Sequence, residues 1–246
     1  MSARFLVVVP AYNEADTIAE VARRASRHAD VCVVDDASTD ATAALAAGLP
    51  RVHVVRHARN THIAGAILDG FRHARAQGYD HCITMDAGLS HDPDAIPAFQ
   101  ARADADLVLG YRARREGVPV LRVALSQGAN WLMNLALERR AVPWGGAGLR
   151  DCTSGFRMYS RRAYELLLEA PLRCRAFDFH IEALACVYRA GLPVAEVPIA
   201  YRFTNSSLRR EIVLEALLTC ARLWVERPDP AADRRGGAAG PPGLPG

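Results

Sequence analysis

Three short apolar runs within the first hundred residues each end in acidic and small polar residues, at positions 7–14, 33–40 and 85–93. A buried parallel strand has such a continuous apolar pattern, and its carboxyl end opens into a binding crevice. The sequence therefore predicts an α/β fold with a site for a polar ligand at one edge of its sheet.

The spacing of these runs indicates an alternation of strands and helices. Strands are predicted over residues 5–9, 31–34, 52–55, 82–85 and 107–109. Helices are predicted over 15–28, 38–47 and 62–77, and another begins at Pro93. This alternation predicts a Rossmann-like, mostly parallel central sheet with right-handed crossovers, flanked by helices.

The regular alternation of predicted strands and helices ends after Tyr111. Helices are predicted over 119–138, 161–170, 177–190 and 208–226, a strand over 194–199, and a flexible turn over 144–149. The residues from 228 to 246 are rich in Pro, Gly and Ala, which indicates a disordered tail. We expect one domain over 1–227, with a ligand-binding half over 1–111 and a second half over 112–227.

Composition limits the chemistry. All 30 basic residues among the 246 are arginine, which excludes a lysine Schiff base and a P-loop lysine. Anions must then be held by arginine forks or backbone amides. The net charge of +3 is too small to indicate a nucleic-acid partner. Six cysteines without a C-x-x-C pair, no signal peptide and no long apolar run favour a cytoplasmic setting.

Three common motifs are missing. No Gly-x-Gly-x-x-Gly follows the first strand, which disfavours a nicotinamide cofactor. Neither Gly-x-x-x-x-Gly-Lys nor Gly-x-Ser-x-Gly occurs, which disfavours P-loop enzymes and α/β-hydrolases.

Acidic residues at the strand ends are the first candidate ligand contacts. Of Asp35 and Asp36, one can brace the turn while the other accepts hydrogen bonds from a ligand; a simple helix-capping pair is the alternative. Tyr12 and Glu14, after Pro10, can stack on and hydrogen-bond a planar base.

Asp86 ends another strand, and Ser90, His91 and Asp92 follow it. A carboxylate here can hold Mg²⁺ or Mn²⁺ together with phosphate oxygens. The alternative is that Asp86 caps the following turn. For Asp92, which precedes Pro93, helix capping is the favoured interpretation.

Four arginines lie near predicted element ends, where an anion site can form: Arg112, Arg122, Arg157 and Arg202. For any single arginine the alternative is a surface ion pair.

Taken together, the motifs resemble those of family 2 glycosyltransferases with the GT-A fold. The motifs are Pro-x-Tyr-Asn-Glu, Val-Asp-Asp-x-Ser-x-Asp, Met-Asp-Ala-x-Leu-Ser-His-Asp-Pro, Asp-x-Thr-Ser-Gly-Phe-Arg and Glu-Val-Pro-Ile. Within this family the chain is most similar to the dolichol- or polyprenol-phosphate mannosyltransferase branch. The resemblance covers about residues 5–215.

For the donor, a nucleotide-sugar, the resemblance implies contacts at the strand ends. Pro10, Tyr12 and Glu14 match positions that line the base and ribose, and Asp36 matches a nucleoside contact. Arg202 matches a basic position near the donor phosphates.

For catalysis, the resemblance implies that Asp86 is the first aspartate of the family's Asp-x-Asp metal motif. Arg112 and Arg122 match arginines that grip the acceptor phosphate.

Two departures from the family pattern matter. Gly88 replaces the second aspartate of the metal motif, which leaves Asp86 with Ser90 as a weak neutral ligand at best. The divalent cation is then held mainly by the donor diphosphate, or arginines replace it. The family's phosphate-gripping lysine is also missing from residues 204–207, where Arg209 or Arg210 is the available substitute.

The hypothesis that follows is an inverting hexosyltransferase that uses a polyprenyl phosphate acceptor. The resemblance favours mannose from GDP-mannose, while UDP-glucose and UDP-N-acetylglucosamine stay open. A phosphate monoester is already charged and needs no general base.

Two other functions stay open. A hydroxyl acceptor would require a base, for which Asp151, Asp178 and Glu182 are candidates. Gly88 also leaves room for a non-catalytic nucleotide-sugar-binding protein. The helix at 208–226 has an apolar face edged by arginine, which fits peripheral contact with the cytoplasmic membrane face or packing on the core.

Overall fold

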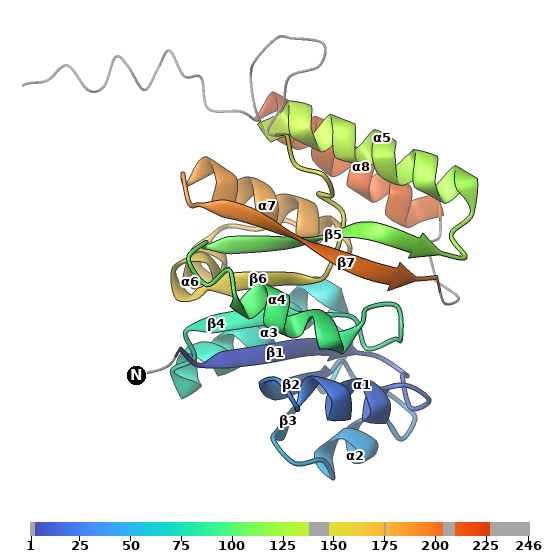
Figure 1. Ribbon diagram of the computed structural model, residues 1–246, viewed down its shortest axis with the longest axis vertical. Coiled ribbons are helices and arrows are strands. Elements are labelled where there is room, and N and C mark those ends of the chain that lie inside the picture. The colour runs from blue at the N-terminus through green and yellow to red at the C-terminus, as the bar shows by residue number, and fades with distance from the viewer. Residues whose placement is uncertain (1–2, 138–147, 175, 204–209, 227–246) are drawn as a thin grey trace, which may run out of the picture.

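The computed structural model describes residues 3–137, 148–174, 176–203 and 210–226, with residues 121–122 and 210–217 described by their backbone alone. Its centre is a seven-stranded sheet in the order β3-β2-β1-β4-β6-β5-β7 (Figure 1). The strands are β1 (Phe5–Ala11), β2 (Asp30–Asp35), β3 (Val52–Arg56), β4 (His81–Thr84), β5 (Leu107–Glu116), β6 (Arg157–Ser160) and β7 (Val194–Arg202).

Six of these strands are parallel, which confirms the predicted mostly parallel α/β architecture. The exception is β6, which pairs antiparallel with both β4 and β5. The sequence analysis missed this strand, because its four residues, Arg-Met-Tyr-Ser, include an arginine and form no apolar run. β5 also continues to Glu116, beyond the predicted end at 109, because its second half pairs with β7.

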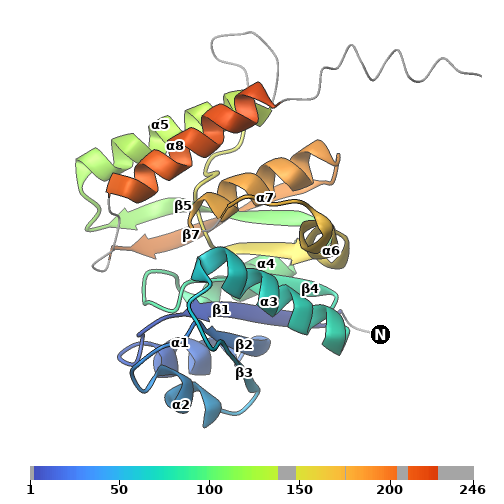
Figure 2. The ribbon, with the colours of Figure 1, turned by 180° about the vertical axis from the view of Figure 1, so that it is seen from behind.

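Helices cover both faces of the sheet (Figures 1 and 2). They are α1 (Ile18–Ala25), α2 (Thr42–Ala47), α3 (His62–Gln77), the 3₁₀ turn η1 (Pro93–Ala95), α4 (Ile96–Gln100), α5 (Val120–Leu137), α6 (Arg161–Glu169), α7 (Asp178–Arg189) and α8 (Arg210–Val225). Among the described helices, none combines the length and hydropathy needed to cross a bilayer. The predicted tail at 228–246, and most of the predicted turn at 144–149, lie outside the described residues.

The first two helices begin later than predicted, at Ile18 rather than 15 and at Thr42 rather than 38. The residues in front of them build the site loops: Glu14 O accepts hydrogen bonds from the amides of Thr17 and Ile18, and Asn13 N–H donates to Ser38 Oγ at 2.9 Å. Polar side chains at these positions therefore form hydrogen bonds within the loops, and the helices begin after them.

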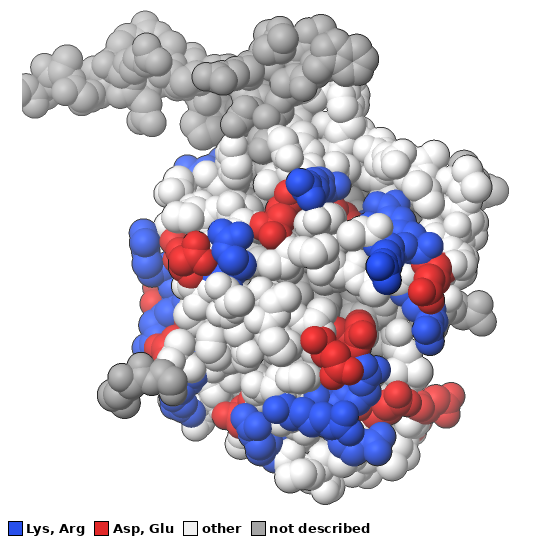
Figure 3. All heavy atoms as spheres, in the orientation of Figure 1, with Lys and Arg blue, Asp and Glu red and all other residues white. Residues whose placement is uncertain are grey.

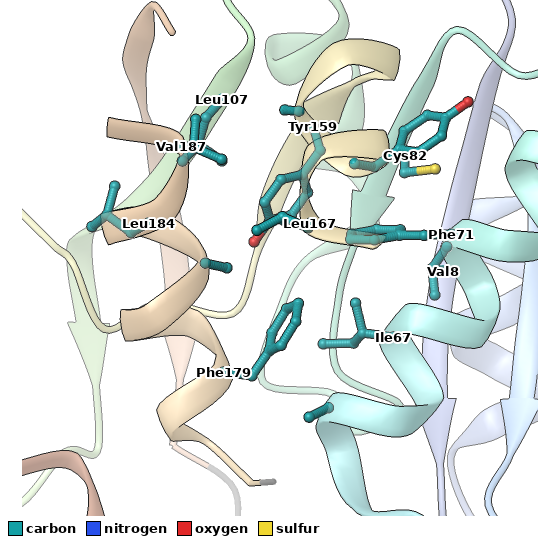
Figure 4. Close-up of a cluster of buried hydrophobic side chains, with 14 of the residues drawn as sticks. Val8, Ile67, Phe71, Cys82, Leu107, Tyr159, Leu167, Phe179, Leu184 and Val187 are labelled. Carbon is teal, nitrogen blue, oxygen red and sulfur yellow. The ribbon is translucent and has the colours of Figure 1, made fainter. Parts of the chain in front are cut away.

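The core is divided by the sheet into two layers, because successive strand residues point to opposite faces. In β1, Leu6 and Val8 contribute to one cluster, while Val7 and Val9 contribute to the other. Figure 4 shows the first cluster, in which Phe71 of α3 lies close to Val8 and Cys82. This packing holds the strands rigidly, so that their carboxyl ends present loops in fixed positions.

α5 and α8 lie side by side beyond α7, at the β5–β7 end of the molecule (Figures 1 and 2). Met133 of α5 and Leu223 of α8 are both buried in the same core cluster. The two helices therefore form one layer over the half of the sheet opposite to β3.

Candidate functional site

The carboxyl ends of β2, β1 and β4 meet at one edge of the sheet, because these strands are parallel neighbours. The backbone ties their ends together: Asp36 N–H donates to Ala11 O at 2.9 Å, and Met85 N–H donates to Val8 O at 3.1 Å. The structure thus brings together the three loops that the sequence analysis singled out, as expected for a crevice at a parallel sheet edge.

The first two loops are joined by side-chain hydrogen bonds. Thr39 N–H donates to Asn13 Oδ1 at 2.9 Å, and Glu14 N–H donates to Thr42 Oγ1 at 2.8 Å. Asn13 and Ala37 have positive φ angles of 54° and 65°. For a residue such as alanine this conformation costs about 1–2 kcal/mol, so that the surrounding bonds must hold it in place.

Asp35 and Asp36 both brace the crevice. Asp35 is fully buried, accepts a hydrogen bond from Ser38 N–H at 3.2 Å and lies 3.2 Å from Arg56 Nε. Asp36 Oδ1 lies 2.7 Å from His57 Nδ1 and accepts hydrogen bonds from the amide and hydroxyl of Thr61. One oxygen of Asp36 therefore fixes the β3–α3 loop.

A surface hollow of about 450 Å³ adjoins Asp36. It is lined by Ala37, Ser38, Arg56, His57 and Ala58. The sequence analysis missed Arg56 and His57, whose only signal is that they directly follow the third predicted strand.

The predicted base-contacting residues lie on the neighbouring β1 loop. Pro10 is within β1, and the ring of Tyr12 is half exposed, as stacking on a base requires. Glu14 is half-buried, and its pKa is raised, mainly by burial. The charge of Asp86 also raises this pKa, whereas a hydrogen bond from Thr17 lowers it. Glu14 and Asp86 thus lie close enough for their charges to interact.

Asp86 has an accessible carboxylate, with about a third of its side chain exposed. Its N–H donates to His91 Nδ1 at 3.3 Å, and its Oδ2 lies 3.6 Å from the same nitrogen. His91 is buried, and burial lowers its pKa, so the ring is neutral and accepts at Nδ1. Asp92 caps η1 by accepting from Asp94 N–H, which confirms the capping interpretation for Asp92.

The fit of a divalent cation can be judged from these side chains. Apart from residues 87–89 themselves, no described residue has an atom within 4 Å of the point where a Cβ on Gly88 would stand, so the position of the second family aspartate is open. Among the described residues, no three His, Cys, Asp or Glu side chains form a metal-binding group. The residues present fit a cation held by one protein carboxylate together with donor phosphates.

Arg112 lies in the middle of β5, two places from β4 in the sheet. Its Nε and Nη2 donate to the two oxygens of Asp151 at 2.6 and 2.8 Å, and Nη2 also donates to Ser126 Oγ and Thr153 Oγ1. Although burial would lower the pKa of Arg112, its bonds with Asp151 raise it, and the same bonds hold the pKa of Asp151 below its usual value despite burial. This is an ionised pair beside two hydroxyl groups.

Tyr201 of β7 contacts both His91 and Arg112. Its ring lies 5.9 Å from the ring of His91 and 5.4 Å from the guanidinium carbon of Arg112. The charge of Asp86 also contributes to the raised pKa of Arg112. The predicted metal aspartate and the predicted acceptor arginine therefore belong to one site. The sequence analysis did not predict Tyr201, Ser126 or Thr153 as its members.

The remaining arginines differ in their surroundings. Arg157 is fully buried and donates to the carbonyl oxygens of Cys152, Ser154 and His180, so it supports the loop instead of joining the predicted anion cluster.

Arg202 is mostly exposed, and its Nε lies 3.3 Å from Glu116 Oε2. Figure 3 shows basic and acidic side chains next to each other at this end of β5 and β7. Because both partners are exposed, the pair is weak and leaves Arg202 available to a donor phosphate.

Arg122 is on α5, but its side chain is not described, and neither is that of the predicted substitute Arg210 on α8; the other substitute, Arg209, lies outside the described residues. The loop at 204–207 lies outside them too.

Comparison with known proteins assigns the family. The model of the family described as "Glycosyl transferase family 2" matches residues 6–168. The chain is 30% identical over 239 residues to an undecaprenyl-phosphate mannosyltransferase of Micrococcus luteus, an alignment that covers 89% of this chain and 93% of that protein. The chain belongs to glycosyl transferase family 2. It is a glycosyltransferase, as the sequence motifs predicted.

Two further comparisons support this assignment. The family 2 chain is 32% identical over 212 residues to a polyprenol monophosphomannose synthase of Mycolicibacterium smegmatis, which covers 80% of this chain and 77% of that protein. It also superimposes on glucosyl-3-phosphoglycerate synthase of Mycobacterium tuberculosis, solved with Mn²⁺ and UDP, with a TM-score of 0.69. The identity is 20%, with 93% of this chain and 82% of that chain covered. The structural likeness confirms the GT-A fold.

Proposed function

We propose that this glycosyltransferase transfers a hexose from a nucleotide-sugar to a polyprenyl phosphate, with inversion at the anomeric carbon. The two curated relatives described above are named for mannose and for polyprenyl acceptors, and the chain covers most of each. Their names favour mannose, and GDP-mannose is the donor proposed.

The observation that carries the acceptor assignment is the arrangement around Arg112. A guanidinium, Ser126 Oγ and Thr153 Oγ1 converge within hydrogen-bond distance of one another. Cationic forks and hydroxyl donors are the groups that bind a phosphate monoester in proteins. Tyr201 joins this cluster to the Asp86 loop, so the bound phosphate would face the donor sugar.

All three carboxylates suggested as a general base for a hydroxyl acceptor already accept hydrogen bonds, Asp178 from Ala176 N–H at 2.9 Å. Asp151 is 2% exposed, and both of its oxygens accept hydrogen bonds from Arg112. Glu182 is also buried, with Arg222 on one oxygen and the amides of Arg173 and Cys174 on the other. A phosphate acceptor needs no base, because it carries about 1.5 to 2 negative charges at neutral pH.

In the proposed reaction, an acceptor phosphate oxygen attacks the anomeric carbon as the bond from that carbon to the donor diphosphate breaks. The nucleoside diphosphate leaves with the bonding electrons. Arg112 and Arg122 would orient the acceptor, and Arg202 would stabilise the leaving diphosphate.

On the donor side, Pro10, Tyr12, Glu14 and Asp36 would bind the nucleoside, next to the hollow described above. Asp86 would hold Mg²⁺ or Mn²⁺ when one is bound. That ion would neutralise charge on the diphosphate. Because Asp86 is the single carboxylate at this position, we expect the protein to bind the ion weakly without the donor.

A lipid surface is the proposed source of the acceptor. On α5, Trp131 is 54% exposed, and on α8, Leu218 is 61% exposed. Figure 3 shows that the surface over α5 carries few charges. Because Ser126, on the same helix, belongs to the proposed phosphate site, the acceptor's hydrocarbon tail would leave the site along this apolar surface.

The function is tested by incubating the purified protein with radiolabelled nucleotide-sugars and either a polyprenyl phosphate or the matching polyprenol. We expect lipid-soluble label with the phosphate alone. Arg112→Gln should raise the acceptor KM by roughly 10- to 100-fold through the loss of charge-assisted hydrogen bonds.

The matched control is Arg102→Gln, because Arg102 is a partly exposed arginine that pairs with Asp104. Thermal unfolding of both variants checks that they fold. Transfer to the polyprenol, or an unchanged acceptor KM in folded Arg112→Gln, would contradict the proposal.

A further inference from the structure

His180, near the start of α7, is a buried histidine whose polar atoms are unused. The residue is 2% exposed, and neither ring nitrogen has a hydrogen-bond partner among the described residues. Leaving a buried donor or acceptor unpaired costs about 1–3 kcal/mol, and native structures keep few such groups. His180 is therefore not a core histidine whose ring is satisfied by hydrogen bonds to its described neighbours.

The ring of His180 lies beside Asp86. A Cβ placed on Gly155 would stand 3.0 Å from His180 Nε2 and 3.4 Å from Asp86 Oδ1. The imidazole and the carboxylate thus border the same glycine, and any larger residue at 155 would crowd both.

The surroundings of His180 keep its ring neutral. Burial, with the charge of Arg157 in addition, lowers its pKa well below the usual value. Arg157 Nη1 donates to the backbone oxygen of His180, and the ring of Phe179 lies 5.7 Å away. A neutral imidazole has one N–H to donate, and it does not cancel the charge of a carboxylate that it contacts.

Asp86 has a partner on its other side. His91 Nδ1 lies 3.6 Å from Oδ2 and accepts from the Asp86 backbone N–H. Position 88 supplies no second carboxylate. The orientation of the Asp86 carboxylate therefore depends on the side chains next to it. His91 borders Oδ2, and Oδ1 and His180 Nε2 border the same glycine.

We propose that His180 is a positioning residue for Asp86, whose Nε2–H donates to Asp86 Oδ1 across Gly155 in the donor complex. Apo structures often leave catalytic hydrogen bonds long, and they tighten when substrate binds. The inference rests on the proposed donor-side role of Asp86. Removal of such a supporting partner typically lowers activity by about 10- to 100-fold.

The test is a double-mutant cycle that combines His180→Leu with Asp86→Asn, measured as kcat for sugar transfer and as thermal unfolding. We expect His180→Leu to lower kcat by roughly 10- to 100-fold while the acceptor KM stays within about twofold. Its Tm should stay level or rise, because two unpaired buried nitrogens are removed. In the Asp86→Asn background, His180→Leu should have no further effect.

Two more variants keep the test decisive if His180→Leu does not fold. His180→Gln retains an amide N–H and should keep most of the activity, whereas His180→Met should not. The control is His73→Leu, because His73 of α3 also has a buried unpaired nitrogen and should leave kcat unchanged.

Each outcome has one meaning. An equal loss of kcat with and without Asp86, a fall in kcat that follows a fall in Tm, or full activity of His180→Met would overturn the inference. If Asp86→Asn alone keeps full activity, the proposed role of Asp86 fails instead.

Discussion

The Arg112–Asp151 pair gives the sharpest prediction about stability. Asp151 is 2% exposed, and it accepts from Arg112 Nε at 2.6 Å, from Arg112 Nη2 at 2.8 Å and from Thr153 Oγ1 at 2.9 Å. Asp151→Asn removes the negative charge and replaces one acceptor oxygen by an amino group that faces Arg112. Breaking a buried ion pair in this way costs roughly 3–5 kcal/mol, because the other charge stays buried.

For a chain of this size, each kcal/mol lowers Tm by about 2–4 °C, so the expected fall in Tm is roughly 6–20 °C. The assay is urea and thermal unfolding followed by circular dichroism. The control is Glu116→Gln, which breaks the exposed pair with Arg202 and should cost about 0–1 kcal/mol.

The pH dependence has a definite sign. The pKa of Asp151 is lowered in the folded state, so the pair stabilises the protein above the unfolded pKa. This stabilisation is lost as pH falls through the pKa of Asp151 in the folded state. The difference in Tm between wild type and Asp151→Asn should therefore become smaller in acid. Equal costs for Asp151→Asn and Glu116→Gln at neutral pH would refute the argument.

Three further outcomes are expected. Gly88→Asp should strengthen Mn²⁺ binding to the donor-free protein in calorimetry, because the added carboxylate has open space beside Asp86; unchanged binding would remove Asp86 from the metal site. Tyr12→Ala should weaken nucleotide binding by roughly 1 kcal/mol or more through lost stacking, and equal thermal shifts by GDP in variant and wild type would contradict this. Trp131→Glu should reduce sedimentation with anionic lipid vesicles while activity on a short-chain acceptor in detergent persists; undiminished sedimentation would exclude α5 from the lipid-facing surface.

The sequence predicted the fold well where local patterns decide it. The apolar runs of β1, β2 and β4 identified buried parallel strands, and their acidic ends identified the crevice edge, because this signal lies within ten residues. The short β6 was missed, since its pairing with β4 and β5 is a tertiary effect that no local pattern announces.

The sequence predicted several residues of the candidate site, but it did not predict which of them contact one another. Arg112 and Asp151 are 39 positions apart in the sequence, and their bidentate pairing depends on the packing of β5 against the loop before β6. In the same way, Gly155 brings His180 next to Asp86 across nearly 100 positions of sequence. Spacing along the chain carries no information about such contacts, which explains why Arg157 was misassigned to an anion cluster.

The most direct measurement of the central claim is ³¹P NMR of the acceptor during turnover with the nucleotide-sugar. If the acceptor phosphate itself attacks the sugar, the monoester resonance should convert to that of a diester, in step with the release of nucleoside diphosphate. Release of nucleoside diphosphate while the monoester resonance stays unchanged would contradict the account.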